Sequence, residues 1–306
     1  MSSPADGKGP VNCRLCSSGE VREVYSGPIR SGGVGSDFID GYRVMGCDAC
    51  GFVFLHPVPE NLDRFYETNE YRERFDYDFS PSSIHRKYDH EQNERILRIG
   101  IQNLRGRVVL DLGASAGVFL DAVRGVARRT VAVEPSAMYR DYLLSRGHVC
   151  YAYPEQAVEA GEQADIVTSF DVIEHVPDPR EFVRHACRLV KPGGTFVLSM
   201  PNLNDMLLRV HKAAFEPFFF QIAHLNYFGA RVIPRLFADS GFLTPRIGFL
   251  HKYGVENLIR WTRYGSPGAV PEVHEMFDEQ FDRHYRIEIE RSGISSHLFI
   301  TASRPA

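Results

Sequence analysis

The sequence predicts an α/β fold built on a mostly parallel sheet, with a small cysteine-bearing module in front of it. Three observations carry this prediction. Short apolar runs alternate with segments of helical spacing from Gly106 onward, the first of these runs ends in a glycine-containing turn, and two C-x-x-C pairs lie near the N-terminus. A chain of 306 residues has room for one large domain and one small one.

The composition is ordinary for a soluble globular protein, with 43% hydrophobic and 24% charged residues. The net charge of −4 and the lack of a dense Lys/Arg run disfavour a nucleic-acid substrate, because phosphate binding requires a concentrated basic surface. The sequence shows no N-terminal signal segment and no run of 18 apolar residues, so we expect a cytoplasmic protein without a membrane segment. In that compartment the six cysteines are better explained by metal binding or core packing than by disulfides.

The first part of the chain, residues 1–58, holds the cysteine pairs Cys13-x-x-Cys16 and Cys47-x-x-Cys50. Each pair can fold as a knuckle, and four thiolates form a closed tetrahedral site. The pattern predicts a structural zinc ion in a zinc-ribbon module, with iron as an alternative ion; a redox dithiol would need only one pair. Because so small a module has little core, metal binding would supply much of its folding free energy.

Residues 59–105 are expected to form a helical linker that covers the pocket of the next domain. Their apolar spacing predicts a helix over 84–104. Aromatic side chains in this part either pack in the core or an interface, or line an acceptor site. They are Tyr66, Tyr71, Tyr77 and Tyr88.

The large domain spans residues 106–306 and is expected to follow the strand–helix rhythm of a parallel sheet. The predicted strands are 107–111, 130–134, 148–151, 165–170, 195–200, 242–250 and 297–302. The predicted helices are 116–124, 137–146, 179–190 and 230–240, with a glycine turn at 193–194. Two segments interrupt the rhythm, and we interpret 203–228 as a lid insertion and 251–290 as a second insertion.

The turn after the first strand reads Asp111-Leu-Gly113-Ala-Ser-Ala-Gly117. Glycines at such a turn let backbone approach a ligand, and the following helix offers free N–H groups. The second strand ends in Glu134, 23 residues after Asp111, near the separation at which an acid accepts hydrogen bonds from ribose hydroxyls. Each feature has a simpler alternative, a tight strand-to-helix turn and a solvated carboxylate, but their combination favours nucleoside binding.

Two further motifs follow in order, Phe170-Asp171-Val172-Ile173-Glu174-His175-Val176 and Leu189-Val190-Lys191-Pro192-Gly193-Gly194. With them, residues 105–302 resemble class I S-adenosylmethionine-dependent methyltransferases. The resemblance implies a Rossmann-like, seven-stranded sheet and S-adenosylmethionine as cofactor, with Glu134 on its ribose. The cofactor-binding residues that it implies are Asp111, Gly113, Ala114, Gly117, Glu134, Pro135, Phe170 and Asp171. One departure is Ser115, which stands where the family often has a central glycine.

Three residues are candidates for catalysis. Glu174 and His175 follow a strand at the edge where α/β sheets bind ligands, and His175 could take the acceptor's proton while Glu174 orients it or meets the substrate. His224 in the lid is the second candidate base. The alternatives are that Glu174 and His175 cap a helix or line the cofactor pocket, and that His224 is a core residue. Together with Asp171 the three could also bind a divalent ion, an arrangement that resembles small-RNA terminal methyltransferases and ubiquinone-pathway O-methyltransferases.

The ribbon followed by Gly51-Phe52-Val53-Phe54-Leu55-His56-Pro57 resembles the leader of methyltransferases from bacterial sugar, polysaccharide and secondary-metabolite pathways. We therefore expect O- or N-methylation of a small polar acceptor, such as a sugar, a nucleotide-sugar or a secondary metabolite. C-methylation is less favoured, because this chain is too short for the further domain that sugar C-methyltransferases carry. The rival interpretations are an RNA or protein methyltransferase and a non-catalytic docking or scaffold protein.

Overall fold

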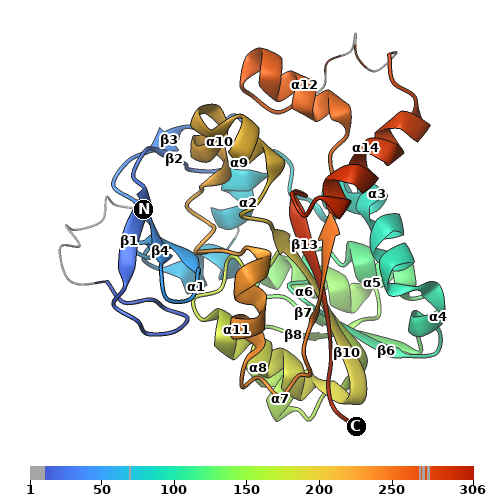
Figure 1. Ribbon diagram of the computed structural model, residues 1–306. Helices are drawn as coiled ribbons and strands as arrows, with labels where there is room; N and C mark the ends of the chain where they lie inside the picture. The colour runs from blue at the N-terminus through green and yellow to red at the C-terminus, as the bar shows by residue number, and fades with distance from the viewer. Residues whose placement is uncertain (1–10, 69, 269, 271–272, 274–275) are drawn as a thin grey trace.

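The computed structural model of the protein describes residues 11–68, 70–268, 270, 273 and 276–306, and its central feature is a seven-stranded sheet with helices on both faces (Figure 1). The strand order is β12-β13-β10-β9-β6-β7-β8. Only β13 runs against its neighbours β10 and β12. The strands are β6 (Val108–Leu112), β7 (Arg129–Val133), β8 (Val149–Tyr151), β9 (Ala164–Phe170), β10 (Val190–Pro201), β12 (Arg246–Leu250) and β13 (His297–Ser303). The predicted Rossmann-like, seven-stranded fold is confirmed.

Side-chain alternation along the strands divides the core into two layers. Val108, Leu110 and Leu112 of β6 pack on one face, whereas Val109 packs on the other. The first face is covered by α7 (Pro154–Glu159), α8 (Pro179–Leu189) and α11 (Ile233–Phe237), and the second by α5 (Val118–Val123) and α6 (Ala137–Ser145). Both faces of the sheet are therefore covered by helices and buried, as is usual for a mostly parallel sheet.

The cover ahead of the sheet is helical, as predicted, but its long helix has other ends. Its helices are α1 (Leu62–Glu67), α2 (Glu70–Phe75), α3 (Pro81–Ile99) and α4 (Ile101–Leu104). The expectation of one helix over 84–104 was wrong. Ser80 caps the start of α3 through the Ser83 N–H, and Gly100, at φ 87°, breaks the helix.

The predicted lid does not stand apart from the N-terminal module. The segment folds as α9 (Met206–Val210), α10 (Lys212–Phe219) and β11 (Asn226–Tyr227), and β11 becomes the fourth strand of a sheet in the order β1-β4-β5-β11. The other strands of the module are β1 (Val21–Tyr25), β2 (Ile29–Arg30), β3 (Phe38–Ile39), β4 (Arg43–Cys47) and β5 (Val53–His56). The sheet of the first 58 residues is therefore completed by a segment 170 residues further along the chain.

The second insertion carries α12 (Val255–Tyr264) and α14 (Glu279–Arg291), which rise above the carboxyl edge of the sheet in Figure 1. Three boundaries also differ from prediction. In place of the helix expected over 230–240 there is a 3-10 turn, η1 (Ala230–Val232), followed by the short α11. The strand expected from residue 242 begins only at Arg246. Strand β10 extends over the glycine turn, with an irregularity in its pairing between Val190 and Thr195. Among the helices of the described ranges, none has the length and apolarity needed to cross a membrane.

Candidate active site

A cavity of about 1530 Å³ opens at the carboxyl ends of the parallel strands. Its walls come from the cover helices, the turns after β6, β7 and β9, the lid and the second insertion. Small-molecule pockets usually measure roughly 300–1,000 Å³, so this cavity has room for a nucleoside cofactor and a second molecule. All predicted site residues of the large domain line it except Gly117.

The turn between β6 and α5 contains glycines at the predicted positions, but neighbouring side chains, rather than the approach of a ligand, are what require them. Gly113, Ser115 and Gly117 have φ values of 77°, 51° and 79°, in the left-handed region. A Cβ on Gly113 would lie 2.4 Å from a methyl of Val172, and one on Gly117 would lie 2.5 Å from a methyl of Leu143. The glycines therefore admit neighbouring side chains, and Gly117 lies behind the cavity wall rather than on it.

Glu134 lies at the tip of β7, buried, and its carboxylate is directed at the glycine turn. Its two oxygens accept hydrogen bonds from the backbone N–H groups of Ser115, at 2.8 Å, and Ser136, at 2.9 Å. Burial raises its pKa, although Arg72 and the two N–H bonds counteract this. The acid thus holds the turn in place and lines the cavity where the resemblance expects the ribose.

Asp111, the last polar group of β6, is buried beside the same turn. The Thr168 hydroxyl donates to its carboxylate at 2.7 Å. Burial raises the pKa of Asp111 to about 7, despite the opposing effects of that hydrogen bond and of Arg95. A cation brought close to Asp111 would favour its ionised form.

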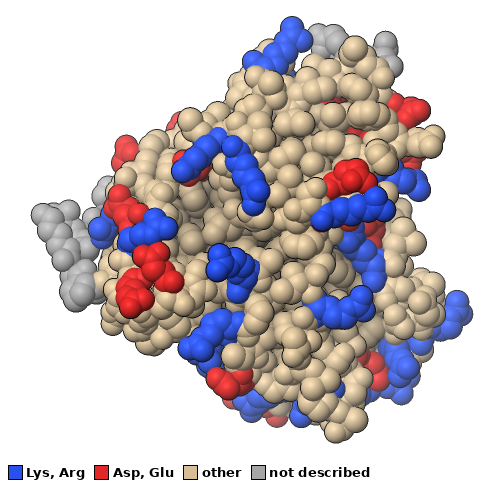
Figure 2. Space-filling model, in the orientation of Figure 1, with Lys and Arg blue, Asp and Glu red and all other residues tan. Residues whose placement is uncertain are grey.

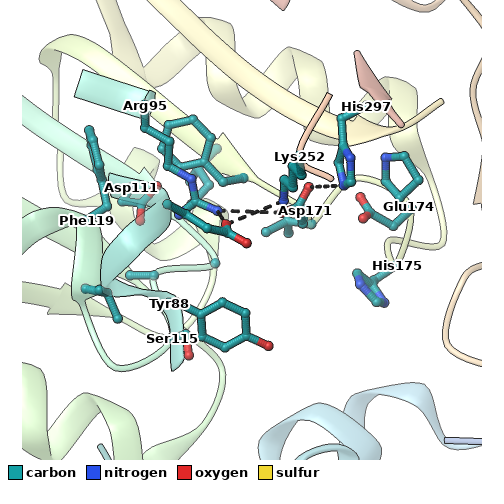
Figure 3. Close-up of a pocket in the computed structure, with 18 of the residues that line it drawn as sticks. Tyr88, Arg95, Asp111, Ser115, Phe119, Asp171, Glu174, His175, Lys252 and His297 are labelled. Carbon is teal, nitrogen blue, oxygen red and sulfur yellow. Dashed lines mark hydrogen bonds and ion pairs between the residues drawn. The ribbon is translucent and has the colours of Figure 1, made fainter. Parts of the chain in front are cut away.

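A cluster of basic side chains surrounds Asp171, directly after β9 (Figure 3). Its carboxylate lies 2.7 Å from Lys252 Nζ, 3.5 Å from His297 Nε2 and 3.6 Å from Arg95. Burial alone would raise the pKa of Asp171, but Lys252, His297 and Arg95 outweigh it and hold that pKa well below its usual range. The residue has φ 58°, an uncommon backbone conformation that these contacts hold in place.

His175 lies across the cavity from Asp111 and Ser115 in the view of Figure 3. Its Nδ1 is 2.9 Å from the Ala223 carbonyl oxygen. Because a carbonyl only accepts, Nδ1 carries the proton and Nε2 keeps its lone pair. Burial lowers the pKa of His175 to about 4, so the ring is neutral at pH 7. The Tyr66 hydroxyl packs against the same nitrogen and carbonyl, at 3.1 and 3.4 Å.

His224 and Glu174 lie beside His175, with unsatisfied polar atoms. One ligand atom of each of the three residues lies within 4.8 Å of the others, and Asp171 is not part of this group. Gln221 meets Nε2 of His224 at 2.7 Å, while His224 Nδ1 and Glu174 Oε2 are buried without a hydrogen-bond partner among the described residues. The ring of His175 is oriented by the Ala223 carbonyl, and Glu174 makes no hydrogen bond to it in the described part of the chain.

The four predicted metal ligands of the N-terminal module come together. Cys13 Sγ lies 3.6 Å from Cys50 Sγ, Cys16 Sγ lies 3.6 Å from Cys47 Sγ, and all four sulfurs fall within 4.8 Å of one another. Four sulfurs placed 2.3 Å from a tetrahedral ion would be about 3.8 Å apart. The donor set therefore fits a zinc ion, and the six cysteines are all unpaired thiols.

Sequence reasoning missed several cavity residues. Lys252 follows β12 and His297 opens β13, and Arg72 and Arg95 come from the cover helices. The register of the outer strands pairs Leu250 with His297, so Lys252 and His297 lie at the ligand edge of the sheet. That placement could have been found from the strand order. Of the tyrosines, Tyr66, Tyr71 and Tyr88 line the cavity, whereas Tyr77 is exposed.

Taken together, this sheet order, the glycine turn and the acid at the next strand tip define an α/β protein with the arrangement that is typical of nucleoside-binding folds. Residues 84–244, more than half of the chain, match the family model described as a methyltransferase domain. The chain belongs to the methyltransferase domain family. The predicted class, an S-adenosylmethionine-dependent methyltransferase, is confirmed at the level of this family.

Curated relatives align over part of their length. A protein named ubiquinone biosynthesis O-methyltransferase from Sodalis glossinidius is 40% identical over 110 residues, which are 33% of this chain and 44% of that protein. The "Probable S-adenosylmethionine-dependent methyltransferase" of Mycolicibacterium smegmatis is 27% identical over 188 residues, 58% of this chain and 68% of that one. The chain spans only 44% to 47% of the length of four ubiquinone-biosynthesis relatives.

Solved structures are similar at lower identity. The crystal structure of an S-adenosylmethionine-dependent methyltransferase from Archaeoglobus fulgidus is 18% identical, with a TM-score of 0.48, and the match covers 74% of this chain and 95% of that one.

Proposed function

We propose that this protein transfers a methyl group from S-adenosylmethionine to an oxygen or nitrogen of a small polar acceptor, with oxygen favoured. The observation that carries the proposal is the neutral His175, whose Nδ1 is held by the Ala223 carbonyl so that Nε2 keeps its lone pair, in the same cavity as Asp111, Ser115 and Glu134. The names of the curated relatives support O-methylation. The sugar, nucleotide-sugar or secondary-metabolite acceptor suggested by the leader segment, and a cytoplasmic setting, remain part of the proposal.

The cofactor would occupy the wall formed by the turns after β6 and β7. Glu134 would accept from its ribose hydroxyls, Asp111 would face the cationic methionine part, and Ala114, Pro135 and Phe170 would contact it. S-adenosylmethionine supplies a methyl group already activated on a sulfonium. The task of the chain is to align the acceptor and to exclude water, which the large, partly aromatic cavity can do.

His175 would remove the acceptor proton. Its Nδ1–H is fixed on Ala223, so the lone pair of Nε2 can accept a proton, and a base with a pKa of about 4 is unprotonated above pH 5. His224 is the second candidate base, and Glu174 a substrate contact.

Calorimetry with S-adenosylhomocysteine, followed by radiolabelled methyl transfer to a panel of phenols, sugars and nucleotide-sugars, tests this function. We expect His175→Ala to keep S-adenosylhomocysteine affinity within about twofold and to lose roughly 10²–10⁴-fold in turnover. His284→Ala, on the exposed face of α14, is the matched control. Full turnover in His175→Ala would remove His175 from the mechanism, and no binding of S-adenosylhomocysteine would favour a scaffold protein.

A second candidate has the cluster of Glu174, His175 and His224 bind a divalent ion. The buried, unpartnered Glu174 Oε2 and His224 Nδ1 favour it, since buried polar atoms are rarely left without partners. As placed, the Gln221 amide nitrogen donates to His224 Nε2, while the Gln221 Oε1 is left without a partner among the described residues. Turning that amide over would let its oxygen accept from Nε2–H of His224, and Nδ1 would then present a lone pair to the ion. Such an ion would polarise the acceptor oxygen. Mn²⁺ binding followed by electron paramagnetic resonance, lost in Glu174→Gln and kept in Glu181→Gln, would support this candidate; no binding would exclude it.

The same proposal assigns a structural zinc ion to Cys13, Cys16, Cys47 and Cys50, in a ribbon of residues 1–58 ahead of the cover and the methyltransferase domain. A nucleic-acid acceptor is disfavoured, because on the face in Figure 2 the Lys and Arg side chains lie in separate groups rather than in one basic patch. Methylation of total RNA by the purified protein would reverse this judgement.

A further inference from the structure

Arg30 of β2 reaches from the N-terminal module into the cavity of the methyltransferase domain. Its backbone is fixed against the lid on both sides: the Arg30 N–H donates to the Phe220 carbonyl at 3.0 Å, and the Ile222 N–H donates to the Arg30 carbonyl at 3.0 Å. Because these two hydrogen bonds fix the backbone of Arg30, only its side chain can adjust its position to a ligand.

The other Arg and Lys side chains of the cavity wall each have a carboxylate partner. The pairs are Arg72–Asp76 at 3.1 Å, Arg95–Glu91 at 2.7 Å, Arg98–Glu290 at 2.7 Å, Lys252–Asp171 at 2.7 Å, Arg283–Glu279 at 3.6 Å and Arg286–Asp282 at 2.6 Å. Arg30 differs from all of these, because within the described ranges no carboxylate forms an ion pair with it.

The surroundings of Arg30 are aromatic and uncharged. Its guanidinium lies 4.3 Å from the ring centroid of Phe218, and its Nε is buried without a hydrogen-bond partner among the described residues. The groups that act on its charge are the phenols of Tyr253, Tyr227 and Tyr71, and burial lowers its pKa. A half-buried guanidinium is costly without an anion, since desolvation is not repaid.

We propose that Arg30 binds an anionic oxygen group, a carboxylate or a phosphate, of the methyl acceptor, a proposal that rests on the function proposed above. Phe218, Phe219 and Phe215 of α10 line the cavity on the same side and supply an apolar wall for the body of such an acceptor. Arg30 also lies close enough to His224 for its positive charge to add to the effect of burial and His175 in lowering the pKa of that histidine. An acceptor held by its anion at Arg30 can therefore present its nucleophile to the histidines.

The competing account is that Arg30 only stacks on Phe218 and fixes α10 to the module. The two accounts differ in ligand chemistry, because a stacking role gives no preference for anions. They also differ in the effect of Arg30→Gln, which would then act on the fold and not on ligands of one charge.

The test uses three probes that share a benzene ring: benzoate, phenyl phosphate and the neutral benzyl alcohol. Each is titrated into the full chain saturated with S-adenosylhomocysteine, by calorimetry and by the fluorescence of Trp261. This single tryptophan lies 5.1 Å from the ring centroid of Phe218 and 4.9 Å from that of Phe215, so it reports on the aromatic wall. The comparison of benzoate with phenyl phosphate separates the two anion types.

We expect at least one anionic probe to bind more tightly than benzyl alcohol. Arg30→Gln should weaken that anion by about tenfold or more and leave benzyl alcohol and S-adenosylhomocysteine unchanged, while Arg30→Lys keeps part of the affinity. Arg22→Gln, on the exposed β1 of the same module, should change nothing.

Equal binding of all three probes to the wild type, or equal anion affinity in Arg30→Gln, overturns the proposal while S-adenosylhomocysteine binding leaves the proposed function intact. If neither protein binds S-adenosylhomocysteine, the proposed function fails instead. If only Arg30→Gln loses S-adenosylhomocysteine, the wild type decides: an anion preference that weakens with added NaCl supports the proposal, and its absence refutes it.

Discussion

At the scale of single residues, the buried Asp111 lowers the free energy of unfolding at the place where a cofactor would be bound. Its folded pKa of about 7 lies above the 3.8 of a free carboxyl, so the folded state binds more protons than the unfolded state between those values. The buried Asp111 carboxyl therefore lowers the stability of the fold to its full extent above pH 7, and this loss of stability is regained as the pH falls through 7 towards 4. Such a cost is tolerable at a site that binds a cation.

We expect Asp111→Asn to raise the free energy of unfolding by about 2 kcal/mol at pH 8, because no charge is then buried, and by less at pH 5.5. The same variant should bind S-adenosylhomocysteine about tenfold more weakly. Urea unfolding at both pH values and calorimetry measure the two effects, with the exposed Asp141→Asn as control. A variant that is less stable than the wild type at pH 8 would contradict the assignment of burial as the dominant effect.

Lys252 neutralises the partly buried Asp171 from an insertion far along the chain. Removal of the ammonium by Lys252→Met should cost about 2 kcal/mol of stability, because Arg95 and His297 compensate only in part. Adding Asp171→Asn should recover much of that loss, since no carboxylate is then left unpaired. A double-mutant cycle by urea unfolding checks the coupling, and strictly additive effects would show that the pair is unimportant.

At the scale of elements, β11 connects the cysteine module to the candidate bases. Asn226 and Tyr227 pair with Phe54 and Val53 of β5, and the N–H groups of Leu225 and Asn226 donate to the Glu174 carbonyl at 2.7 and 3.0 Å. Arg14, inside the first cysteine knuckle, donates to the Leu225 carbonyl. The segment next to His224 is thus held from both sides.

If a metal ion organises the knuckles, its loss should loosen this segment. We expect Cys47→Ser to speed amide hydrogen exchange at residues 53–56 and 222–228 at least tenfold while strands β6 and β9 change little. Cys150→Ser, whose thiol is outside the cluster, is the matched control. Unchanged exchange at 222–228 in a zinc-free protein would show that the lid holds its position without the ion.

At the scale of the whole molecule, the module and the methyltransferase domain share one core. Phe228, which follows β11, is fully buried and packs 5.6 Å from Phe52, centroid to centroid, in a cluster that also contains Cys13, Leu15 and the sheet. We expect Phe228→Ala to cost about 3–5 kcal/mol. Unfolding should remain a single transition when followed by Trp261 fluorescence and by far-UV circular dichroism, whereas two separated transitions would show that the parts are independent.

The sequence predicted the sheet and much of the site because these depend on local patterns. Runs of apolar residues predict strands such as Val108–Leu112. The spacing of the four cysteines predicts that they come together, and the spacing of Glu134 from Asp111 predicts its place beside the glycine turn. Lys252, Arg95 and Arg30 were not found, since their roles come from chain segments brought together only by the tertiary fold. The joining of β11 to β5 was missed for the same reason: two-residue strands carry almost no periodic signal.

The pairing of β11 with β5 also has a consequence for folding during synthesis of the chain. The sheet of the first 58 residues keeps β5 as an open edge until residues 226–227 leave the ribosome, which takes roughly 10–30 s at usual translation rates. During that interval the exposed edge is a site for pairing with a neighbouring nascent chain. Production of this protein should therefore respond to translation speed and to chaperones more than the finished fold, in which β11 covers β5, suggests.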